Sequence, residues 1–193
     1  MRFHNLMKAT CLLAFAALSS VSPGVAAPAN QECTCGVETR WNFPSEASRL
    51  LEEIRATSHR LTESTDRLRS FAYSGISWQS HAIELTQVRE HVNQIGARIE
   101  RLQSIRQVIE PWQQEALDSV TRAGVTVATG TESAIRHLNE NQNFLGSGTY
   151  RNHVASVSSG ADQMKQSVTA HLELAETQAK VEALRQQVAD LGS

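Results

Sequence analysis

The chain has 193 residues, of which 40% are hydrophobic and 5% aromatic, and its formal net charge is −2. Acidic and basic residues are interleaved without a basic block or stripe, so the sequence does not indicate a nucleic-acid partner. A chain of this length fits one folded domain.

The first 29 residues have the pattern of an export signal. Arg2 and Lys8 are followed by an apolar run, Ala9–Val21, which is too short to cross a bilayer comfortably. The small residues of Ala27-Pro28-Ala29 predict cleavage near Ala29, and an uncleaved anchor is the alternative. Cleavage would remove two positive charges and no acid, which leaves a formal net charge of −4. We therefore expect a secreted or periplasmic protein with no transmembrane segment after cleavage.

Residues 30–43 are predicted to form a short flexible tail that contains Cys33 and Cys35. In an oxidising compartment these cysteines can bridge each other, pair with a second chain, or bind a soft metal. A Cys-x-Cys ring is strained, which makes a bridge between two chains a competitor. Cys11 lies in the export signal and should be lost with it.

The segment from residue 44 to 193 has the composition of helices, rich in Glu, Gln, Arg, Ala and Leu. Three short segments interrupt it, at residues 73–77, 110–112 and 145–149. Ser77 is suited to cap the helix that follows it, and Pro111 is suited to the first turn of another. Four long helices joined by short turns predict an all-α fold, an antiparallel up-down-up-down four-helix bundle.

The helix expected after Ser77 has apolar residues at the alternating spacing of three and four that is typical of a coiled-coil seam. Its seam positions are Leu85, Val88, Val92, Ile95, Ile99 and Leu102. The same register extends backwards to His81 and Trp78. His81 therefore occupies a core position where leucine would be expected. It is either a buried polar residue bonded to a neighbour such as Asn141, or a metal ligand.

The last two helices depart from regular patterns. Residues 123–131 are rich in glycine and β-branched residues, which predicts either local looseness or the close approach of a neighbouring helix. In the last helix the apolar spacing slips around His171, as in a coiled-coil stammer. We expect the end of this helix to project or to meet another chain. A homodimer or another protein partner would also help to cover the thin core.

If the helices reverse at the three turns, one end of the bundle gathers five candidate metal ligands. They are His81, Glu84, His137, Glu140 and His153. Imidazole and carboxylate groups suit a divalent transition metal, and bundles place such sites between facing helices. However, only His81 falls on a seam, and the paired Glu-x-x-His pattern of di-iron proteins is absent. The sequence thus favours packed or solvated side chains and no cofactor, with a metal site as the alternative.

The sequence lacks the motif of one known family of helical proteins and resembles another. The Leu-Thr-x-x-Gln motif of periplasmic helical chaperones of the Spy kind is not met, because Arg89 stands where glutamine is required. Four short motifs within residues 76–142 do resemble those of uncharacterised exported proteins from acidobacterial genomes. They are Trp78-Gln-Ser-His81, His91-Val-Asn93, Pro111-Trp-Gln-Gln114 and His137-Leu-Asn139. This resemblance implies export and helices and is silent on activity.

No phosphate-binding loop, nucleophile elbow or His-Glu-x-x-His motif is present, so the sequence does not predict an enzyme. We predict an exported, non-enzymatic helical bundle that acts through protein–protein or cell-envelope contacts. The main alternative is a periplasmic metal-binding or metal-sensing bundle that uses the histidines at one end. A holdase chaperone is a further alternative, suggested by the composition of residues 123–131.

Overall fold

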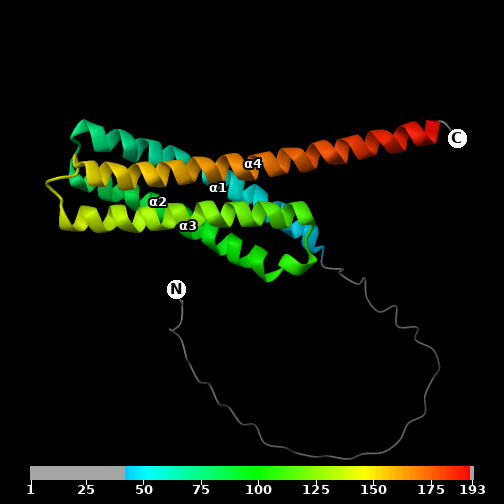
Figure 1. The fold of residues 1–193 in the computed structure, drawn as a ribbon, viewed down its shortest axis with the longest axis horizontal. Helices are drawn as coiled ribbons and strands as arrows, with labels where there is room; N and C mark the ends of the chain where they lie inside the picture. The colour runs from blue at the N-terminus through cyan, green and yellow to red at the C-terminus, as the bar shows by residue number, and fades with distance from the viewer. Residues whose placement is uncertain (1–41, 192–193) are drawn as a thin grey trace, which may run out of the picture. The chain divides into compact units, whose positions relative to one another are not determined.

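The computed structural model describes residues 42–191, which lie within one unit of the chain. The described residues form four α-helices, one short 3-10 helix and no strand (Figure 1). These elements are α1 (Phe43–Ser74), α2 (Trp78–Ser104), η1 (Arg106–Val108), α3 (Pro111–Glu140) and α4 (Gly148–Leu191). The all-α prediction is confirmed for this part of the chain. The export signal, its cleavage near Ala29 and the tail with Cys33 and Cys35 lie outside the described residues.

The helices begin and end close to the predicted turns. The side chain of Asn42 accepts a hydrogen bond of 3.1 Å from the backbone N–H of Ser45 at the start of α1. Gly75 ends α1 with φ of +64°, in the left-handed region that glycine adopts without strain. Ser77 precedes α2 as predicted, but its hydroxyl contacts Ser80 Oγ at 3.2 Å instead of capping the helix.

The start of α3 is fixed by a buried glutamine that the sequence did not single out. Pro111 lies in the first turn of α3, as predicted. Gln113 accepts a hydrogen bond of 2.9 Å from the backbone N–H of Glu110. Its Nε2 atom donates to Pro44 O at 2.8 Å and to Ser48 Oγ at 2.9 Å. Gln113 therefore joins the start of α1 to the first turn of α3, and both of its polar side-chain atoms are hydrogen-bonded.

The four helices pack as a bundle. α1 and α3 each contact both α2 and α4, whereas α1 and α3 hardly touch each other. The predicted seam of α2 is buried from Leu85 to Leu102, with Val92 half-buried. The prediction for Trp78 is wrong, because this side chain is 38% exposed at the first residue of α2.

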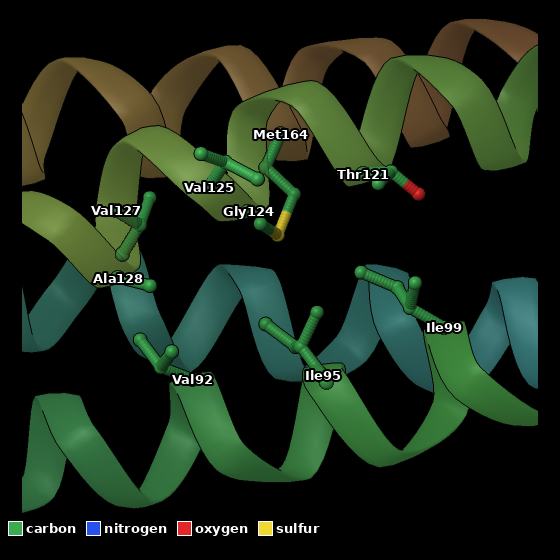
Figure 2. Close-up of a pocket in the computed structure, with 10 residues that line it drawn as sticks. Val92, Ile95, Ile99, Thr121, Gly124, Val125, Val127, Ala128 and Met164 are labelled. Carbon is green, nitrogen blue, oxygen red and sulfur yellow. The ribbon is translucent and has the colours of Figure 1, made fainter. Parts of the chain in front are cut away.

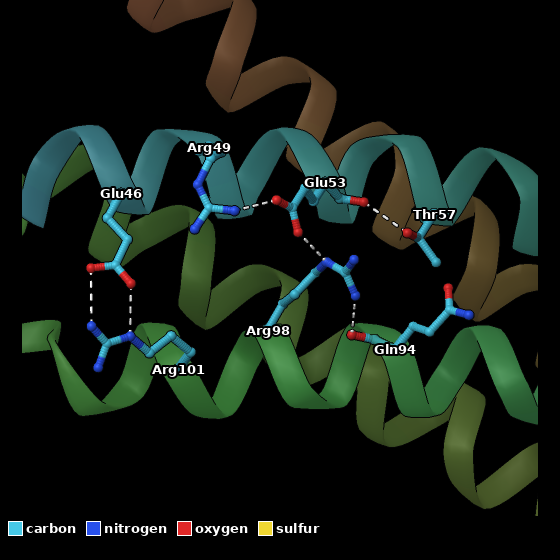
Figure 3. Close-up of polar contacts among 7 residues, drawn as sticks. All are labelled: Glu46, Arg49, Glu53, Thr57, Gln94, Arg98 and Arg101. Atoms are coloured by element: carbon cyan, nitrogen blue, oxygen red, sulfur yellow. Dashed lines mark hydrogen bonds and ion pairs between the residues drawn. The ribbon is translucent and has the colours of Figure 1, made fainter.

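Ionic pairs join α1 to α2 along one side of the bundle (Figure 3). Arg101 contacts both carboxylate oxygens of Glu46, at 2.8 and 3.0 Å, and Arg98 contacts Glu53 at 2.8 Å. Glu53 also pairs with Arg49 on its own helix. The hydrogen bonds from Arg101 and Arg98 hold the pKa values of Glu46 and Glu53 below their ordinary value of 4.5. These pairs fix which levels of α1 and α2 lie side by side.

α3 and α4 approach each other closely at two glycines. A methyl group at Gly130 would lie 2.9 Å from Val157 Cγ2, and one at Gly160 would lie 2.8 Å from Val127 Cγ2. Both distances are shorter than van der Waals contact, so any larger residue at these two positions would force Val157 or Val127 to move. The close approach predicted for residues 123–131 is therefore confirmed, and this segment is continuous helix.

Candidate functional site

His81 is a buried core residue whose partner is Tyr150. The His81 side chain is 1% exposed and that of Tyr150 is fully buried. His81 Nδ1 and Tyr150 Oη are 2.9 Å apart, and the His81 ring also meets the edge of Phe71 with centroids 5.8 Å apart. Burial lowers the pKa of His81 and raises the pKa of Tyr150. Both shifts favour the neutral forms of the two side chains that this hydrogen bond joins.

The prediction that Asn141 is the hydrogen-bond partner of His81 is wrong. Asn141 is the first residue after α3, and its backbone N–H and its side-chain amide both donate to His137 O, at 2.9 and 3.3 Å. Tyr150, in the first turn of α4, takes its place beside His81. The sequence offered a weak signal for this role, because Tyr150 is an aromatic residue directly after the turn at 145–149.

Glu84 is buried, and its carboxylate forms an ion pair with an arginine. The Glu84 side chain is 8% exposed, and its Oε1 atom accepts hydrogen bonds from Arg67 Nη2 at 2.9 Å and Nε at 3.1 Å. Arg67 also donates to Ser64 Oγ at 3.0 Å, and its bond to Glu84 raises its own pKa. Of the packed and solvated positions that the sequence left open for this flanking residue, Glu84 takes the packed one. The carboxylate stabilises the contact between α1 and α2.

The other three candidate ligands do not complete a metal site. The rings of His137 and His153 lie 6.1 Å apart, and His137 also lies against Tyr150 with centroids 5.5 Å apart. His137 Nε2 is 3.2 Å from Ser147 Oγ, and Glu140 is exposed at the last residue of α3. Within residues 42–191, no three His, Cys, Asp or Glu side chains come together in a way that could hold a metal.

The five candidate ligands of the alternative metal site are thus not brought together, and this end of the bundle holds an aromatic and imidazole cluster. His81, His137 and His153 do gather at one end of the bundle, but Tyr150 stands between the first two. Glu84 is directed to Arg67. The physical reason is that Tyr150 fills the core position where the ligands would have had to converge.

A hollow of about 430 Å³ lies next to His81, between the turn that joins α1 to α2 and the turn that joins α3 to α4. Its walls include Trp78, Gln142 and Arg151. Arg151 Nε donates to Ala72 O at 3.1 Å, and its guanidinium lies 4.6 Å from the centroid of the Tyr73 ring. Arg151 is therefore used to close this end of the bundle.

Two histidines, the buried His81 and the half-buried His91, make stability depend on pH. Burial lowers the pKa of His81 below its ordinary value of 6.5, and burial followed by the charge of Arg60 lowers the pKa of His91. The unfolded chain therefore binds more protons at these rings than the folded protein does. Their contribution to stability is complete above about pH 6.5 and is lost as the pH falls below it. We expect the melting temperature to decrease between about pH 7 and pH 5.

Circular dichroism melts at several pH values would measure this decrease. The carboxylates of Glu46 and Glu53 have lowered pKa values, so their contribution is lost only below about pH 4.5, outside this window. In a His81→Leu/Tyr150→Phe variant, the decrease between pH 7 and 5 should be smaller, because only His91 remains of the two histidines. An unchanged decrease would contradict the role given to His81.

An apolar groove lies between α2 and α3 (Figure 2). It encloses about 200 Å³, and Ile95, Ile99 and Val125 are among its lining residues, with Met164 of α4 behind them. Gly96 also lines it, and a methyl group at Gly96 would meet nothing within 4 Å. This contrasts with the tight contact of α3 and α4 at Gly130 and Gly160. α3 thus packs closely on α4 and leaves room on the side of α2.

The C-terminal part of α4 contains an uncovered row of apolar side chains. The last buried residue of α4 is Leu172, and residues 173–191 contain none. The row, which we name the tip stripe, consists of Leu174, Val181, Leu184, Val188 and Leu191. Leu184 is 60% exposed and Val188 70%. In Figure 1 the orange-to-red end of α4 has no helix beside it.

The comparisons with known proteins give no relative: no family model, no curated protein and no solved structure matches the chain. The resemblance to exported acidobacterial proteins therefore stays a prediction. No helix within residues 42–191 is both long and apolar enough to cross a membrane.

Proposed function

We propose that this protein is an exported, non-enzymatic helical bundle that acts through contacts with another protein, and that the tip stripe is its contact surface. The observation that supports this most directly is the exposure of the tip stripe on a segment that buries none of its side chains in the bundle. Exposed contiguous apolar surface on an exported protein is typical of an interaction site. Export to the periplasm or beyond rests on the signal pattern of residues 1–29.

We include in this proposal the antiparallel, up-down-up-down order of the helices. Glu46 of α1 pairs with Arg101 of α2, whereas Arg67 of α1 pairs with Glu84. Residue numbers therefore rise along α1 as they fall along α2, which supports antiparallel neighbours. In this arrangement the bundle body serves as a rigid base for the tip of α4.

The proposal is tested by photo-cross-linking in the cells that make the protein. A photoreactive amino acid placed at Leu184, within the tip stripe, should yield covalent adducts, and the adducts can be identified by mass spectrometry. The matched control has the same amino acid at Gln186, which is exposed two residues further along the same helix. We expect abundant adducts from position 184 and few from position 186.

Equal or absent adducts at the two positions would contradict the proposed contact surface. Cell fractionation of the same samples tests export independently, because retention of the uncleaved chain in the cytoplasm would contradict that part of the proposal.

A further inference from the structure

We infer that the partner of the tip stripe is the tip stripe of a second copy of this chain, and that the two α4 helices pair as an antiparallel coiled coil. This inference rests on the proposed function and names its partner. From Leu174 onward the stripe recurs at intervals of seven, three, four and three residues, which is a heptad pattern. Val181 and Val188 occupy one core position of the heptad, and Leu184 and Leu191 occupy the other.

The stripe faces away from the core of its own bundle. Ala161 is fully buried, and Leu184 follows it by 23 residues. On a helix with 3.6 residues per turn these two side chains point about 140° apart. The slip of spacing around His171 is what separates the two faces. α1 and α3, which cover the face of Ala161, therefore cannot cover the tip stripe, and a separate helix is needed.

An antiparallel partner matches the stripe layer by layer. With a two-fold axis between Glu182 and Ala183, Val181 of one copy meets Leu184 of the other. Leu174 meets Leu191 in the outermost layers, just beyond Leu172, where burial in the bundle ends. The overlap of residues 174–191 is thus accommodated next to the bundle without displacing it.

The remaining layer of the coiled coil, which contains a threonine, can also be packed without an unpaired polar atom. Thr177 of one copy meets Val188 of the other in this register. The hydroxyl of Thr177 donates a hydrogen bond of 2.8 Å to Glu173 O on its own helix. Thr177 can therefore enter the interface with its polar atom already paired and its methyl group available for packing.

Charge selects the antiparallel orientation over the parallel one. In a parallel pair, Lys180 of one helix flanks the core beside Arg185 of the other, which places like charges together. In the antiparallel pair, Lys180 faces Gln187 and Arg185 faces Gln178, so the repulsion is absent. Lys180 also retains its ion pair with Glu176 at 2.6 Å on its own helix.

Sedimentation equilibrium of the mature protein, with a reducing agent to remove any cysteine bridge, tests the pairing. We expect a reversible dimer with a dissociation constant of about 1–100 µM, as suits a short interface. A Val181→Glu/Leu184→Glu variant should be monomeric. The control Ala179→Glu/Gln186→Glu adds the same charges on the opposite face of the tip and should still dimerise. A monomeric wild type, or equal dimerisation of the two variants, would overturn the inference.

Disulfide trapping tests the orientation. In a Cys33→Ser/Cys35→Ser background, the Val181→Cys and Leu184→Cys variants are oxidised separately and as a mixture. The antiparallel pair predicts that the mixture yields a covalent heterodimer while each variant alone yields little dimer. Efficient cross-linking of each variant with itself would show a parallel pair and overturn the inferred orientation.

The inference and the proposed function can fail separately. If the wild type is monomeric but position 184 still forms adducts with a different protein in cells, self-pairing is overturned and the contact surface stands. If position 184 forms no adducts and the protein is monomeric, both are overturned. Adducts of twice the mass of the chain, together with dimerisation in solution, support both.

Discussion

Replacing Gly160 with leucine should lower the free energy of unfolding by about 2–3 kcal/mol, because the new side chain cannot fit between α3 and α4. Its first carbon alone would lie 2.8 Å from Val127 Cγ2 and 3.3 Å from the Val127 backbone nitrogen. Two packed helices would have to separate to relieve these contacts. Urea unfolding followed by circular dichroism would measure the loss.

The matched control is Gly96→Leu, the same substitution in the middle of another helix. At Gly96 a methyl group meets nothing within 4 Å, and the residue lines the apolar groove between α2 and α3. Leucine has the higher helix propensity and can fill the groove, so we expect stabilisation by about 1 kcal/mol. Opposite signs for the two variants are the expected result. Destabilisation of both by the same amount would contradict the difference in packing on the two sides of α3.

The His81→Leu and Tyr150→Phe substitutions should each cost about 1–3 kcal/mol of stability, because each leaves one buried polar atom without its partner. In the first variant the Tyr150 hydroxyl is unpaired, and in the second the Nδ1 atom of His81 is unpaired. Both side chains are almost completely buried, so water cannot replace the missing partner at little cost.

The double variant His81→Leu/Tyr150→Phe should be within about 1 kcal/mol of the wild type, because both polar partners are then replaced by apolar groups. A double-mutant cycle of urea unfolding measures this coupling. Additive losses, with the double variant as unstable as the sum of the single ones, would show that the 2.9 Å hydrogen bond contributes nothing.

The sequence was a good guide wherever one side chain alone determines the local structure. Pro111 marks the first turn of α3, the predicted turn at residues 73–77 contains Gly75 with its positive φ, and the heptad spacing locates the buried face of α2. The slip near His171 likewise agrees with the end of burial at Leu172. These features depend on neighbours within one helix, so periodicity and capping chemistry suffice to find them.

The residues that surround the site depend on which turns of neighbouring helices lie side by side. The sequence predicted this alignment less accurately. The turn predicted between α3 and α4 spans residues 145–149 and so has Ser147 at its centre, but α4 already begins at Gly148. The connection is instead centred near residue 144, which brings Tyr150 beside His137 and His81. Moving the centre by about three residues changes which residues of α3 and α4 lie level by about six, which is more than one helical turn. No periodicity within a single helix reports it.

Glu84 shows a second limit. The heptad pattern assigns only two positions in seven to the core and places Glu84 beside them. In the structure, however, Glu84 is buried. Each helix of this bundle packs on two neighbours, so its buried face is wider than a two-stranded seam. Arg67 of α1 makes the burial of the carboxylate tolerable by pairing with it.

Amide hydrogen exchange of residues 173–191, measured at about 1 µM and about 200 µM protein, tests the central claim that the tip of α4 is covered by a second copy. Residues 173–191 form a helical segment that packs on no neighbour in the monomer, and a helix of this length is only marginally stable in water. Its amides should therefore exchange fast in the monomer. The account predicts that exchange in the tip slows by about two- to tenfold at the higher concentration, as a dissociation constant of about 1–100 µM requires, while residues 47–172 are unchanged. Fast exchange in the tip at both concentrations would contradict it.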